Sequence, residues 1–154
     1  VRSRTESGDE KAERIFVFLI GLQRMKKLRY EEEFSFGETT ASAGALLNEI
    51  ICEGAACGVH VVALLDTFAS VGRCLSRKAL GSLEMRTIFQ MSSSDSASLT
   101  DSPKAATLGM HRALYYNEHE GTLETFRPYA RPDAAWIKRA TESLATRGKA
   151  TPAH

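Results

Sequence analysis

The chain has 154 residues, of which 43% are hydrophobic, 25% are charged and 8% are aromatic, and its formal net charge is +1. This composition is that of an average soluble globular protein, and it excludes wholesale disorder, a collagen-like fibre and a small disulfide-stapled domain. A near-neutral charge gives no support to non-specific binding of nucleic acid or membrane surfaces, although a local basic patch is compatible with it. The sequence opens with Val1 and its first methionine is Met25, so we expect it to be part of a longer polypeptide.

The first two thirds of the chain alternate between predicted strands and predicted helices. A polar approach segment over residues 1–14 precedes them. An apolar run at residues 15–20, and a second at 59–65 that only His60 interrupts, predict strands buried on both faces, and a third strand is predicted at 85–91. Apolar residues at helical spacing predict two helices between these strands, at residues 42–56 and 70–83. A short basic helix at 23–30 and an exposed loop at 31–42 complete this part.

The last third has a different pattern. Short apolar stretches at 112–116 and 123–126 flank a turn that contains Gly121, which predicts a β-hairpin. A final helix is predicted over 132–145, and residues 131–154 are expected to form this helix and a frayed tail. Strands that alternate with helices are typical of a parallel sheet with crossover helices. The predicted fold class is therefore α/β, with a mainly parallel sheet and a closing hairpin at its edge.

The three cysteines give two readings. Cys52, Cys57 and His60 are near neighbours in sequence and could form part of a metal site, whereas cysteine is also a common small core residue. The sequence offers no fourth metal ligand and no disulfide spacing, so we favour the core reading and a reducing cytoplasm. The longest apolar run is too short to span a bilayer, and we expect no membrane contact in this segment.

Residues with chemical potential follow the predicted strands. In an open α/β sheet, ligands bind outside the carboxyl ends of the strands. There, Asp66 and Asp95 could hold a metal or orient a water, and Arg24 and Arg86 could face a phosphate. Each of these is also compatible with a loop cap or a surface charge. The Gly-x-x-x-x-Gly-Lys-[Ser/Thr] loop that binds nucleotide phosphates is absent from these residues.

Four segments, read in order, resemble the DNA translocase motors of the FtsK/SpoIIIE family. The stretch Glu53-Gly54-Ala55-Ala56-Cys57-Gly58-Val59-His60 resembles the family's EGxxxGIH element, which ends a helix and enters a core strand. Met85-Arg86-Thr87-Ile88-Phe89-Gln90-Met91-Ser92 with Asp95-Ser96, and then Leu99-Thr100-Asp101-Ser102, are similar to its R-hhhxhS…DS region. Leu108-Gly109-Met110-His111-Arg112-Ala113-Leu114-Tyr115 is similar to its LGxGxhLY element. The resemblance implies that residues 15–130 are the carboxyl-terminal half of the motor domain.

The resemblance also implies a fold, cofactors and partners. It implies part of a RecA-like P-loop ATPase core that uses ATP and Mg²⁺, assembles as a hexameric ring and threads double-stranded DNA. On this reading residues 15–20 form the strand that normally ends in the two acids of the Walker B motif, which hold magnesium and polarise the attacking water. Gly21-Leu22-Gln23 stands in their place, and Asp66 falls near the polar residue that follows the next strand.

Those departures bear on catalysis. Phosphoryl transfer requires the P-loop lysine, magnesium and the acids, and the Walker A loop would lie before Val1. We therefore expect no ATP hydrolysis by these residues alone, with Gly21, Gln23 and Asp66 as degenerate nucleotide-site residues. Asp66 and Arg86 are the remaining catalytic candidates, and Arg86 is equally compatible with a ring interface or a salt bridge at the edge of the core. The alternative hypotheses are a non-hydrolytic scaffold derived from such an ATPase, and a nucleotide-independent enzyme that uses Asp66 and Asp95.

Overall fold

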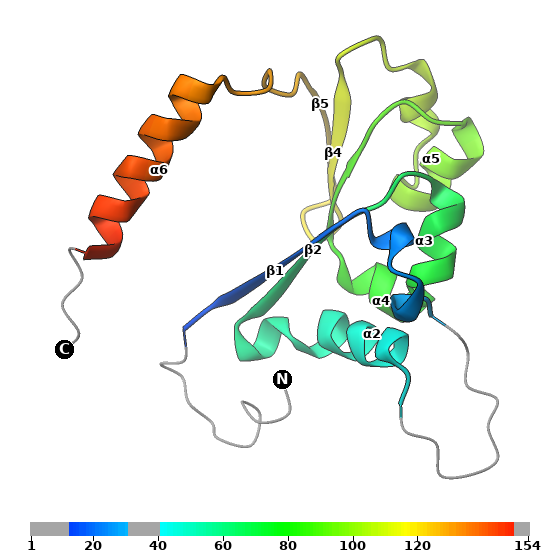
Figure 1. Cartoon of the computed structure of the whole chain (residues 1–154). Helices are drawn as coiled ribbons and strands as arrows, with labels where there is room; N and C mark the ends of the chain where they lie inside the picture. The colour runs from blue at the N-terminus through cyan, green and yellow to red at the C-terminus, as the bar shows by residue number, and fades with distance from the viewer. Residues whose placement is uncertain (1–12, 31–40, 150–154) are drawn as a thin grey trace.

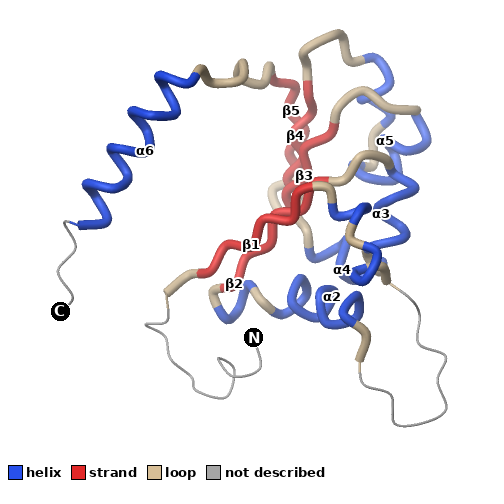
Figure 2. Tube along the Cα trace, viewed as in Figure 1, coloured by secondary structure: helices blue, strands red, loops and turns tan. Residues whose placement is uncertain are grey.

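A computed structural model of the chain describes residues 13–30 and 41–149, with side chains up to residue 146. Most of the predicted approach segment and of the loop at 31–42 lies outside the described residues. The fold is mixed α/β with two separate sheets (Figure 1, Figure 2). Its helices and strands are β1 (Ile15–Ile20), α2 (Ala43–Glu53), β2 (Val59–Leu64), α3 (Phe68–Cys74), α4 (Arg77–Ser82), β3 (Met85–Ile88), α5 (Ser93–Thr100), β4 (Ala113–Asn117), β5 (Thr122–Phe126) and α6 (Ala134–Lys149). Short 3-10 helices link them: η1 (Leu22–Arg24), η2 (Lys26–Leu28), η3 (Ala55–Cys57) and η4 (Pro103–Thr107).

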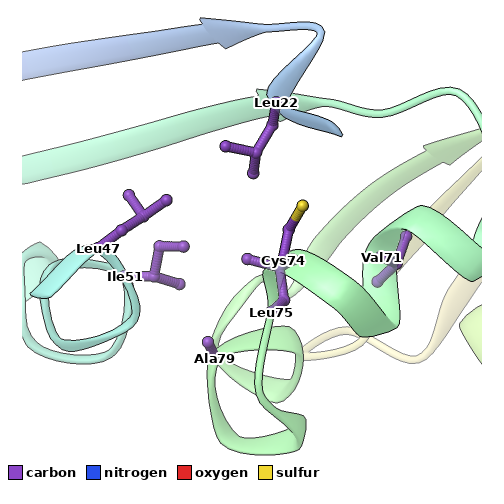
Figure 3. Close-up of a cluster of buried hydrophobic side chains, with 7 residues drawn as sticks. All are labelled: Leu22, Leu47, Ile51, Val71, Cys74, Leu75 and Ala79. Atoms are coloured by element: carbon purple, nitrogen blue, oxygen red, sulfur yellow. The ribbon is translucent and has the colours of Figure 1, made fainter. Parts of the chain in front are cut away.

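β1 and β2 form a parallel pair, with Ile15 opposite Val59 and Ile20 opposite Leu64. Because successive side chains of a strand point to opposite faces, each strand presents one set of side chains to α2 and another set away from it. The α2 face builds the first hydrophobic core, in which the close-up of Figure 3 shows side chains from η1, α2, α3 and α4 meeting. The buried members of this core are Leu22, Leu47, Ile51, Val71, Cys74, Leu75 and Ala79.

The opposite face of this pair is open, so the prediction of strands buried on both faces is wrong for β1 and β2 within the described residues. Phe18 is 65% exposed and Ile20 is 63% exposed, and the other large apolar side chains of this face are similarly uncovered. We call this surface the open face; its members are Phe16, Phe18, Ile20, Val62 and Leu64. The run of apolar residues arises because this second face is apolar too, and not because the described chain buries it.

β3, β4 and β5 form an antiparallel sheet, so the prediction that the third strand extends a parallel sheet is wrong. Ile88 at the end of β3 lies opposite Leu114 near the start of β4, because α5 and η4 return the chain to the same end of β3 from which it left. The predicted hairpin is confirmed as β4 and β5, with Gly121 at φ 62 in its turn. A second core lies beneath this sheet, formed by Ile88, Leu99, Ala105, Leu108 and Leu114.

The helix predicted over 70–83 is two helices, α3 and α4, that meet at Leu75 and Ser76. Leu75 is extended, with φ −121 and ψ 134, and the N–H of Ser76 donates to Asn48 Oδ1 at 2.7 Å. Asn48 Nδ2 in turn donates to the carbonyl of Cys74 at 3.1 Å. The buried amide of Asn48 therefore satisfies backbone groups on both sides of the break, which stabilises it.

α6 begins at Ala134, close to the predicted start, and the carboxylate of the preceding Asp133 accepts the N–H of Trp136 at 2.6 Å. It stands apart from the rest of the molecule (Figure 1), with Trp136, Ile137 and Leu144 exposed. Among the described residues, no helix combines the length and apolar character needed to cross a membrane.

Candidate functional site at the ends of the parallel strands

The end of β1 is a tight turn that directs the chain into the first core. Gly21 has φ 73, a left-handed conformation that glycine adopts without steric cost, and its N–H donates to the carbonyl of Leu64 at 3.0 Å. The next residue, Leu22, is fully buried in the core. Consequently an apolar side chain follows the end of β1, where the FtsK/SpoIIIE family carries the two acids of the Walker B motif.

Gln23 follows on η1, which packs against α3. Its Oε1 atom is buried and has no hydrogen-bond partner among the described residues. An unpaired buried carbonyl oxygen costs about 1–3 kcal/mol. The strand end thus presents an amide acceptor and no carboxylate from β1.

Asp66 follows β2 and is exposed, within a group of hydroxyls. Thr67 caps α3 by accepting the N–H of Ser70 at 3.3 Å, and its hydroxyl lies 3.3 Å from Asp66 Oδ1 as a donor. Arg73 Nη2 donates to Ser70 Oγ at 3.2 Å. The hydroxyl of Ser70, and with it that of Thr67, lowers the pKa of Asp66, so the carboxylate stays ionised at neutral pH.

Gly21 and Asp66 lie at adjoining strand ends, because β1 and β2 are adjacent parallel strands and the N–H of Gly21 donates to the carbonyl of Leu64; Gln23 follows Gly21 on η1. The exposed carboxylate of Asp66 suits hydrogen bonding to a donor or pairing with a single cation, whereas the amide oxygen of Gln23 is buried. Asp95 lies in the first turn of α5, where its N–H donates to the hydroxyl of Ser92 at 3.1 Å. No group of three metal-ligating side chains occurs in the described part of the chain.

The sequence pattern did not identify the hydroxyls of Thr67 and Ser70 as part of this site. The available signal was the order Asp-Thr-x-x-Ser directly after an apolar run, since threonine before a helix typically caps it and bonds three residues on. A helix capped by Thr67 begins at residue 68, and this cap places the hydroxyls of Thr67 and Ser70 close to Asp66.

Arg86 is held inside the fold by four acceptors. Its guanidinium donates to the carbonyls of Leu83, Leu99 and Leu80 at 2.9, 2.8 and 2.9 Å, and it forms a salt bridge with Glu118. Its side chain is 13% exposed. The predicted salt bridge at the edge of the core is therefore present, and Arg86 joins α4, α5 and the β4–β5 turn.

The cysteines contribute to packing. Cys74 is 1% exposed in the first core, where burial raises the pKa of its thiol, and Cys52 packs against the same core. His60 stacks on Phe16 with ring centroids 5.1 Å apart. These contacts agree with the core reading for Cys52 and Cys74.

Comparisons of the chain with protein-family descriptions, with curated proteins and with solved structures find no match. The resemblance to the FtsK/SpoIIIE family therefore depends on the quoted segments and on their order.

Proposed function

We propose that this chain is the carboxyl-terminal half of an FtsK/SpoIIIE-type, ATP-dependent DNA translocase domain that works in a hexameric ring on double-stranded DNA. The observation that carries the proposal is the open face of β1 and β2. Parallel sheets are almost always covered on both faces, and here one face exposes five large apolar side chains. A RecA-like core completed by a further half would cover that face.

The glycines of the first matching segment support the proposal. A Cβ atom at Gly54 would lie 2.4 Å from the carbonyl oxygen of Ile50 and 2.8 Å from that of Val59, so only glycine fits there. Gly58 has φ 70, a left-handed conformation that ends η3 and starts β2. Both glycines serve the helix-to-strand junction at which the family carries its EGxxxG element.

In this proposal the two halves of the domain have different duties. The Walker A loop of the other half would bind ATP and Mg²⁺, and the strand ends with Gly21, Gln23 and Asp66 would border the nucleotide. Arg86, whose donors are occupied inside the fold, would stabilise the half-domain and take no part in phosphoryl transfer.

The test is the ATPase activity of the full-length protein, measured with and without double-stranded DNA. We expect hydrolysis that DNA stimulates, and a loss of about 100-fold in Asp66→Asn if this carboxylate orients water in place of the absent acids. Glu124→Gln, which removes an exposed carboxylate on β5, is the matched control and should retain activity. Absence of hydrolysis with and without DNA would contradict the motor.

A second candidate function is a non-hydrolytic scaffold or partner-docking domain derived from such an ATPase. The observation that favours it is Leu22, which is fully buried where an acid would be required. A scaffold predicts that the full-length protein assembles normally and hydrolyses no ATP, whereas robust turnover stimulated by DNA excludes it.

A further inference from the structure

Two adjoining depressions lie where the chain enters β4 and leaves β5. One has a volume of about 420 Å³ and the other of about 490 Å³, and Arg127 lines both. We call the combined surface the arginine groove. The members used below are Phe89, His111, Arg112, Phe126, Arg127 and Tyr129.

The charge of the groove is positive and unopposed. Arg112 and Arg127 are exposed, and neither forms a hydrogen bond or an ion pair with any residue that the structure describes. Neither depression has an acidic residue in its lining. Arg86 is the opposite case, because its donors are occupied by three carbonyls and Glu118. The two groove arginines are therefore available to an anion from outside the described chain.

Large rings are exposed beside these cations. Tyr129 is 102% exposed, Phe89 is 55% exposed and Phe126 is 39% exposed. Such rings provide flat surfaces on which a base can stack, at about 1–3 kcal/mol per base. His111, with φ 60, lies in a left-handed conformation that non-glycine residues seldom adopt and that is enriched at functional sites.

A ligand that uses both features must alternate negative charge with flat aromatic surface. Unpaired nucleic acid does so at every nucleotide. In a duplex the bases are stacked on each other and do not reach the rings. An acidic peptide would engage the arginines and leave the rings without a partner.

We propose that the arginine groove binds single-stranded nucleic acid, with Arg112 and Arg127 on successive phosphates and Tyr129 and Phe89 stacked on a base. Two depressions that share Arg127 suit two consecutive nucleotides. The inference depends on the groove alone and not on the proposed motor. A protein without ATPase activity could still bind single-stranded nucleic acid, and an active ATPase could fail to bind it.

Binding is measured with the full chain and a fluorescein-labelled oligothymidine of about 12 nucleotides, by fluorescence anisotropy. We expect Tyr129→Ala to weaken binding about tenfold, because it removes one stacking surface. Tyr129→Phe keeps the ring and should bind like the wild type. Equal binding by Tyr129→Ala and Tyr129→Phe would overturn the proposal.

Salt dependence tests the arginines separately. Removing one phosphate contact from single-stranded DNA reduces the slope of log K against log salt by about 0.7, which we expect for Arg127→Ala. Arg77→Ala removes an exposed arginine on α4 and should leave the slope unchanged. If Tyr129→Ala loses the native circular dichroism spectrum, the salt slopes of Arg127→Ala and Arg77→Ala test the proposal instead. Equal slopes for these two variants would overturn it. The proposal is also overturned if Tyr129→Ala weakens the binding of a duplex of equal length as much as it weakens that of oligothymidine. It is overturned as well if a polyglutamate peptide displaces the oligonucleotide as readily as unlabelled oligothymidine does.

Discussion

The two sheets of this chain both leave one face uncovered by the described residues, but they differ in what that face contains. On the antiparallel sheet the outer side chains of paired positions include polar ones, such as Thr87 opposite Tyr115 and Asn117 opposite Thr122. On the parallel pair the open face is apolar except for the half-buried His60. Antiparallel sheets commonly face water on one side, whereas parallel sheets seldom do. In the proposed half-domain, the antiparallel sheet would be complete and the open face of the parallel pair would be covered by the other half.

The inner faces differ as well. Beneath the antiparallel sheet, polar groups link separate elements. Arg86 of β3 donates to three carbonyls, and the hydroxyl of Ser96 in α5 lies 3.2 Å from the N–H of Ala105 and 2.5 Å from the carbonyl of Ser102. The inner face of the parallel pair depends mainly on apolar packing, and the buried polar side chains on this side, among the described residues, are those of Asn48 and Ser70. Substitutions that remove either a polar link or an apolar side chain test this comparison.

The largest expected effect is that of Arg86→Met. It leaves three carbonyls without their donor, at about 1–3 kcal/mol for each one that stays buried, whereas the lost salt bridge to Glu118, which is 44% exposed, adds at most about 1 kcal/mol. Urea denaturation measures the change in the free energy of unfolding. Arg77→Met, on the exposed side of α4, should change stability by less than about 0.5 kcal/mol. If the two variants had equal stability, the antiparallel sheet would not depend on Arg86.

A smaller effect, which depends on pH, is expected for Tyr116→Phe. Burial, and then the nearby charge of Asp101, raises the pKa of the Tyr116 hydroxyl, which donates to Asp101 Oδ2 at 3.4 Å. A native pKa above the unfolded value of about 10 gives stability that is present below pH 10 and is lost as the pH rises through the native pKa. At neutral pH the variant should lose at most about 1 kcal/mol, the contribution of one hydrogen bond.

Equilibrium unfolding at a series of pH values measures this difference. The advantage of the wild type over Tyr116→Phe should shrink from about pH 10 upward. An advantage that stays constant through that range would mean that the hydroxyl titrates alike in the native and unfolded chains.

The sequence predicted the strands and the hairpin well, because continuous apolar runs and a glycine turn are strong local signals. It did not predict the direction of β3, since a four-residue strand carries no information about which strand pairs with it. The break between α3 and α4 was missed because it depends on Asn48, which is distant in sequence from Ser76. In the candidate site, Gly21 and Asp66 lie at adjoining strand ends, and the role of Gly21, Gln23 and Asp66 at a nucleotide stays a prediction. The acceptors of Arg86 were not predictable, since they are carbonyls brought together only by the tertiary fold.

The smallest expected effect on stability is that of Phe18→Ser, and it is the sharpest test of the open face. Phe18 is 65% exposed, so its removal should change the free energy of unfolding by less than about 0.5 kcal/mol, whereas Leu22→Ala in the core should cost about 2–5 kcal/mol. An exposed apolar surface of this kind promotes association, and Phe18→Ser should therefore reduce self-association of the chain in sedimentation velocity and the binding of a hydrophobic dye. If Phe18→Ser destabilises the chain as much as Leu22→Ala, a segment of the same chain already covers the face. In that case the parallel pair is as complete as the antiparallel sheet, and the main support for the proposed half-domain is removed.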